Sequence, residues 1–76
     1  MDHLQFQNIP ITSEYITLGQ LLKFAGIIGS GGEAKDFLES GQTMVNGQPE
    51  ARRGRKIYPG DVVVLPQGNT IKVSSQ

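Results

Sequence analysis

The sequence lacks cysteine, which excludes disulfide bonds and thiolate metal sites. It also lacks any run of 18 apolar residues, so no segment is predicted to span a membrane. The start, Met1-Asp2-His3, has neither the basic nor the apolar region of a secretory signal. Together these absences favour a cytoplasmic protein without a membrane partner.

Catalytic patterns are missing as well. No Ser/His/Asp set, no carboxylate pair in helical register and no Gly-x-x-x-x-Gly-Lys phosphate loop is present. The single histidine, His3, lies near the terminus and is a poor candidate for a metal ligand. We therefore expect no enzyme activity, no cofactor, no metal and no small-molecule substrate.

The chain is neutral overall, with 7 Lys and Arg against 7 Asp and Glu. Its 76 residues, of which 37% are hydrophobic, predict one folded domain over residues 1–76. A neutral chain attracts a large anion only where its cations gather, so the positions of the basic residues decide the functional prediction.

A first helix is predicted to begin after Thr17. Thr17 and Gln20 have the spacing of a capping box, and Gly26 is placed to end the helix. Four apolar residues lie at i, i+3, i+4 and i+7 and form one stripe: Leu18, Leu21, Leu22 and Ala25.

A second helix is predicted by the same logic. Ser30 and Glu33 repeat the capping-box spacing, and Gly41 follows the last apolar residue. The apolar face of this helix consists of Ala34, Phe37 and Leu38. Two short helices joined by about four residues must pack on each other or on a shared sheet.

Alternation of apolar and polar residues predicts a half-buried strand over residues 3–9, with Leu4 and Phe6 on one face. Pro10 is expected to weaken any continuation of this strand. We expect Phe6 and Phe37 to belong to the core.

A change to period two after Gly41 predicts further strands. Asn46-Gly47 is the preferred pair for a type I′ hairpin turn, and Pro59-Gly60 suits a type II turn. The strands fall near Val45 and Glu50 and over residues 62–65 and 70–73. The predicted fold class is α+β, with two consecutive short helices packed on a small antiparallel sheet.

Four of the seven cations fall within five residues: Arg52, Arg53, Arg55 and Lys56. Such a cluster repels itself unless an anion is near, and arginine can grip phosphate oxygens in a bidentate fork. The alternative is a solvated loop between strands, and spacing alone does not separate the two.

Other candidate contacts are weaker on their own. Ser30, Gly31 and Gly32 would present backbone N–H groups to an anion, although they also serve simply as a helix start. Lys23 and Lys35 would extend the basic surface or remain solvated helix lysines. Tyr58 is placed either to stack on a base or to pack under the Pro59-Gly60 turn.

Taken in order, the motifs resemble the S-four domain, the RNA-binding module of small-subunit ribosomal protein four. The resemblance covers about residues 16–65 and rests on Leu18-x-x-Leu21-Leu22-Lys23-x-Ala25-Gly26, Ser30-x-x-Glu33-Ala34-Lys35-x-x-Leu38, Gly41-x-x-x-Val45-Asn46-Gly47, Lys56-Ile57 and Pro59-Gly60-Asp61-x-Val63. The chain looks most like the small stand-alone bacterial members that carry no enzyme domain.

The resemblance implies an alpha-L type motif that docks on structured RNA, often ribosomal RNA. Gly31 is a departure, because many members carry an arginine just after the serine of the second helix start. The residues predicted to bind RNA are Lys23, Ser30, Gly31, Gly32, Lys35, Arg52, Arg53, Arg55 and Lys56.

Two alternatives stay open. An assembly module that binds a basic protein would use the carboxylates of Glu33, Asp36, Glu39 and Glu50. A β-grasp sulfur carrier shares the Leu-rich helix and the Val-Asn-Gly turn, but it requires a C-terminal Gly-Gly where this chain ends Ser74-Ser75-Gln76. Charge alone does not separate RNA from DNA as the ligand.

Overall fold

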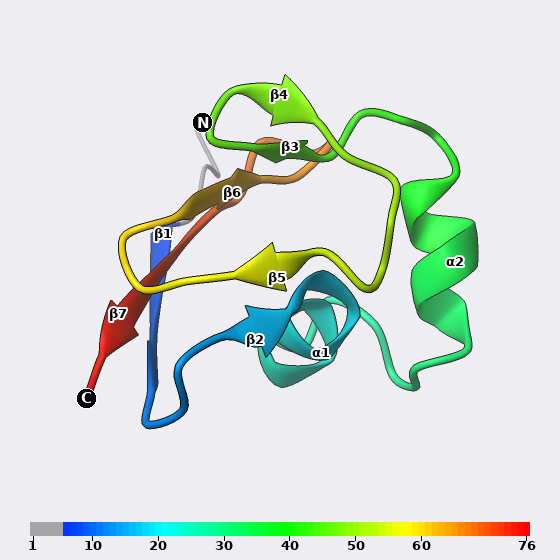
Figure 1. Cartoon of the computed structure of the whole chain (residues 1–76). Coiled ribbons are helices and arrows are strands. Elements are labelled where there is room, and N and C mark those ends of the chain that lie inside the picture. The colour runs from blue at the N-terminus through cyan, green and yellow to red at the C-terminus, as the bar shows by residue number, and fades with distance from the viewer. Residues whose placement is uncertain (1–5) are drawn as a thin grey trace.

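A computed structural model describes residues 6–76 as two short helices and two sheets (Figure 1). The larger sheet has five strands in the order β1-β7-β6-β3-β4, and β2 pairs separately with β5. The elements are β1 (Phe6–Ile11), β2 (Ile16–Thr17), α1 (Leu18–Phe24), α2 (Glu33–Leu38), β3 (Met44–Val45), β4 (Gln48–Pro49), β5 (Lys56–Ile57), β6 (Val62–Val64) and β7 (Thr70–Ser75). The α+β class is confirmed.

The larger sheet is mixed, so the expectation of an antiparallel sheet is wrong for one strand. β1 pairs with β7 in parallel, from Phe6 opposite Thr70 to Ile11 opposite Ser75, whereas the other pairs are antiparallel. β1 meets its partner only at the far end of the chain, and local sequence does not specify the direction of so distant a pairing.

Pro10 lies inside β1, contrary to the expectation that it would weaken the strand there. β1 is an edge strand with β7 as its single neighbour, so the missing proline N–H removes no bond to a second strand. The first residues of the predicted strand over 3–9 lie outside the described residues.

One hydrophobic core joins buried residues of both helices with inward-facing residues of the larger sheet and of β5. Leu18, Leu21 and Leu22 are fully buried, which confirms most of the predicted stripe of α1. Phe6, however, is 69% exposed, and its assignment to the core is wrong. The inward residues of β1 are Ile9 and Ile11, and Phe6 has the opposite parity along the strand. Phe37 packs against the core while remaining partly exposed.

The ends of α1 follow the sequence prediction. The N–H of Gln20 donates to the Thr17 hydroxyl over 3.3 Å, and the Thr17 N–H donates to the Gln20 side-chain oxygen over 3.2 Å. At the other end, the N–H of Ile27 reaches the Leu22 carbonyl over 2.9 Å, as in a Schellman cap. The predicted capping box is therefore confirmed.

The start of α2 differs from the prediction. The helix begins at Glu33 after Gly32, without a side-chain cap, so Ser30 is not its N-cap. The Glu33 carboxylate nevertheless accepts hydrogen bonds from the backbone N–H groups of Gly29 and Ser30. The Glu33 half of the expected capping box is therefore present and the Ser30 half is not. The reason is that the chain turns over Ser30–Gly32 before the helix begins.

The predicted turns are present. Asn46 and Gly47 both have positive φ, 51° and 82°, as a type I′ hairpin requires. Gly60 has a φ of 99°, which fits the third position of a type II turn. The Asn46 side chain also donates to the Asp61 carboxylate over 3.0 Å and accepts from the Val62 N–H over 2.9 Å. The hairpin is thus tied to the segment that follows β5.

Candidate nucleic-acid interface

Residues 52–56, here called the basic loop, end at the first residue of β5 and lie against the start of α1. The Leu18 N–H donates to the Arg55 carbonyl over 2.8 Å, and the Gly19 N–H donates to the Arg53 carbonyl over 2.8 Å. The first N–H groups of a helix have no partner within the helix. Here they fix the backbone of the basic loop at the helix start.

Gly19 permits this close approach. A Cβ atom at position 19 would lie 3.3 Å from the Arg53 Cβ and 3.4 Å from the Arg53 carbonyl oxygen. Gly19 is not among the residues predicted from the sequence, although a glycine inside a short helix costs about 1 kcal/mol relative to alanine and therefore signals a packing constraint.

A buried carboxylate organises the basic loop from the other side. Glu50 is only 8% exposed, and its carboxylate accepts the backbone N–H groups of Ala51 and Arg52. The same carboxylate pairs with Arg52 Nε at 3.0 Å and with Arg55 Nη1 at 2.8 Å. The hydrogen bonds from Arg52 and Arg55 lower the pKa of Glu50 to about 2, against a burial effect that would raise it. Glu50 in turn raises the pKa of Arg52.

Glu50 divides the four cations of the loop into two kinds. Arg52 and Arg55 are paired with it, whereas Arg53 and Lys56 form no ion pair within residues 6–76. Arg52 is still 76% exposed. A guanidinium has five N–H donors, of which Arg52 uses two on Glu50, so it retains donors for a further anion.

The turn before α2 lies beside the basic loop. One groove is lined by Thr17, Gly19, Gln20, Gly31, Ala34, Arg53 and Gly54. Glu33 already accepts the Ser30 N–H, while no acceptor within the described chain takes the N–H groups of Gly31 and Gly32. The structure thus places the predicted Gly31 and Arg53 in the same groove.

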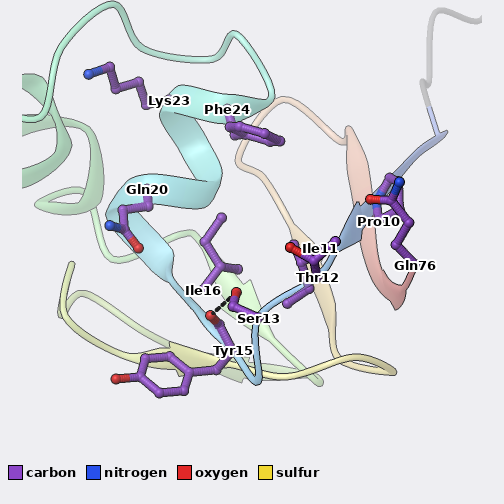
Figure 2. Close-up of a pocket in the computed structure, with 10 residues that line it drawn as sticks. All are labelled: Pro10, Ile11, Thr12, Ser13, Tyr15, Ile16, Gln20, Lys23, Phe24 and Gln76. Carbon is purple, nitrogen blue, oxygen red and sulfur yellow. Dashed lines mark hydrogen bonds between the residues drawn. The ribbon is translucent and has the colours of Figure 1, made fainter.

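The two predicted helix lysines lie outside the groove that holds Gly31 and Arg53. Lys23 is exposed and belongs to a second groove, which it shares with Tyr15, Gln20 and Phe24 (Figure 2). Lys35 is exposed on α2 and lines neither groove.

An aromatic pair borders the basic loop. The antiparallel pairing of Ile16 with Ile57 places Tyr15 next to Tyr58, with ring centroids 5.8 Å apart. The Lys56 ammonium lies 5.0 Å from the centre of the Tyr15 ring. Sequence reasoning missed Tyr15 because strands of two residues carry no periodic signal.

These residues belong to a small domain whose basic loop is fixed on its first helix. Residues 9–74 match the family model of the S4 domain, which is the S-four domain of the sequence analysis, and the chain belongs to this family. A relative from Bacillus subtilis (strain 168), described as "Probable ribosome maturation protein RlbA", is 58% identical over 57 residues. The aligned part covers 75% of this chain and 80% of that protein.

The family match favours the S4 resemblance over that of a β-grasp carrier. The alternative of an assembly module loses one of its four carboxylates, because Glu50 is buried and paired with Arg52 and Arg55. Over residues 6–76, no helix is long and apolar enough to cross a membrane, and no three potential metal ligands gather.

Proposed function

We propose that this protein is a non-catalytic RNA-binding protein of the cytoplasm that docks on structured ribosomal RNA. The observation that carries the proposal is the basic loop, held by two backbone hydrogen bonds at the start of α1 in a member of the S4 domain family. The proposed contact residues are Lys23, Ser30, Gly31, Gly32, Lys35, Arg52, Arg53, Arg55 and Lys56.

Within this set, Arg53 and Lys56 contribute most, since no carboxylate of the described chain neutralises them. Arg52 and Arg55 contribute a second layer of donors, held in one geometry by Glu50. A loop ordered before binding loses less conformational entropy when it meets RNA. Phosphate contacts position a protein without reading bases, so specificity comes from the shape of the RNA.

Ribosomal RNA is the proposed partner because the relative from Bacillus subtilis is named for ribosome maturation. That name describes the relative, and the extension to this chain rests on 58% identity across most of both proteins. Binding through about four to six phosphates predicts a slope of about −3 to −5 for log K against log salt concentration.

The test is a titration of deproteinised ribosomal RNA over a salt series. The double variant Arg53→Ala/Lys56→Ala should bind at least tenfold more weakly and should reduce the magnitude of the salt slope, because two phosphate contacts are lost. Lys72→Ala is a control for the loss of a cation elsewhere, since Lys72 is exposed on β7, which pairs with β1 and β6 and not with β5. Equal binding by the two variants would refute the proposed site.

A further inference from the structure

Tyr15 and Tyr58 remain unexplained by phosphate binding or by the core. Their rings are tilted at 51° to each other, and 37% of Tyr15 and 43% of Tyr58 stay exposed. Figure 2 shows the Tyr15 ring extending outward from the ribbon, away from Phe24. Single exposed aromatic residues are common on protein surfaces, whereas two exposed rings side by side form a patch of the kind that binds a ligand.

The positions of both tyrosines are fixed by backbone interactions. Tyr15 precedes β2 and Tyr58 follows β5, so the pairing of these two strands sets the rings side by side. The Tyr58 N–H also donates to the Asp61 carboxylate over 2.8 Å. An exposed pair held in this way presents an ordered aromatic surface, which costs little entropy to bind.

The pair is continuous with the basic loop. Tyr58 lines one groove with Arg52, Arg55 and Lys56, and Lys56 also covers the Tyr15 ring. A nucleotide joins a flat base to a phosphate through one sugar, and this surface offers aromatic rings and a cation at adjacent points. Stacking of bases on tyrosine is a general means of holding an unpaired nucleotide.

We propose that Tyr15 and Tyr58 form a stacking platform for an unpaired nucleobase, whose phosphate is bound by Lys56. This inference rests on the proposed function and adds to it the class of RNA feature that is recognised. The ligand is then a helix with an adjacent unstacked nucleotide, such as a loop or a bulge, rather than a continuous duplex.

The chain offers a direct probe, because it has no tryptophan and only these two tyrosines. Tyrosine fluorescence therefore reports on the platform alone. We compare an RNA hairpin that has an unpaired loop with a blunt RNA duplex carrying the same number of phosphates. The hairpin should quench the fluorescence and bind at least tenfold more tightly, equal to about 1.4 kcal/mol.

Three variants test the role of the rings. Tyr15→Leu/Tyr58→Leu should bind hairpin and duplex equally, while Tyr15→Phe/Tyr58→Phe should keep the preference for the hairpin. Phe6→Leu is a control, since Phe6 is an exposed aromatic residue on β1 that lines neither the groove of Tyr15 nor that of Tyr58. Thermal melting shows whether each variant is folded. If the leucine variant does not fold, the native fluorescence decides, and a hairpin that binds without quenching overturns the platform.

The failures of the two proposals are distinguishable. Suppose that the leucine variant keeps the hairpin preference while Arg53→Ala/Lys56→Ala weakens binding to both RNAs. The proposal of a stacking platform is then refuted, and the proposal that the basic loop binds RNA is supported. If the native protein binds neither the hairpin nor the duplex nor ribosomal RNA, both the proposed function and the stacking platform are refuted.

Discussion

Glu50→Gln removes the one negative charge that organises the basic loop. The carboxylate holds two backbone N–H groups and two guanidinium groups at the same time. The amide of glutamine keeps one acceptor oxygen but turns N–H donors toward the donors of Arg52 or Arg55. We therefore expect a less stable fold and a less ordered basic loop, although the net charge becomes more positive.

The size of the effect follows from the pKa of Glu50. A fall from the ordinary value of 4.5 to about 2 corresponds to about 3 kcal/mol of differential stabilisation. Water surrounds the exposed Arg52 and screens part of this interaction, so we expect a loss of about 1–2 kcal/mol at neutral pH. For a domain of this size, each kcal/mol lowers Tm by about 4–8 °C.

The pH dependence separates this account from a general packing defect. Because the pKa of Glu50 is lower in the folded than in the unfolded chain, its stabilisation is complete above about pH 4.5 and is lost as the pH falls toward about 2. Urea unfolding of the native protein and of Glu50→Gln should therefore differ at pH 7 and converge near pH 2.

Glu39→Gln is the matched control, since Glu39 is exposed at the end of α2. It should leave the free energy of unfolding within about 0.5 kcal/mol of the native value. A Glu50→Gln protein as stable as this control at pH 7, or a deficit that stays constant down to pH 2, would refute the role assigned to Glu50.

Other consequences of the structure can be measured on single variants. Asn46→Ala loses two side-chain hydrogen bonds and strains a positive φ, so urea unfolding should show a loss of about 1–3 kcal/mol. Gly19→Val should displace the basic loop and shift its amide NMR signals, whereas Gly31→Ala should not, because a Cβ there meets no atom within 4 Å. Phe24→Ser should change stability by less than about 0.5 kcal/mol, while Leu22→Ala should cost about 2–5 kcal/mol in the same assay.

Local chemistry explains what the sequence could predict. The capping box of Thr17 and the hairpin turn at Asn46 depend on neighbouring residues, and both are present. The cluster of cations is equally visible in the sequence. Its location against α1 is not, because Gly19 meets Arg53 across more than thirty positions of chain.

Long-range pairing accounts for the errors. β1 pairs with β7 in parallel, whereas an antiparallel sheet is expected from the sequence. Because side chains alternate along β1 and Ile9 points into the core, Phe6 lies on the exposed face. In the sequence, Glu50 is one of several carboxylates that could face a basic partner, since sequence does not show that it is buried beside two arginines. Tyr15 is recognised as a candidate contact residue only from the pairing of β2 with β5, which places it beside Tyr58.

Crosslinking in living cells, with identification of both the attached RNA and the crosslinked peptide, tests the central claim most directly. We predict ribosomal RNA joined to the peptide that contains residues 52–58. Recovery of crosslinks only on β7 near Lys72, or of no ribosomal RNA above background, would contradict the account.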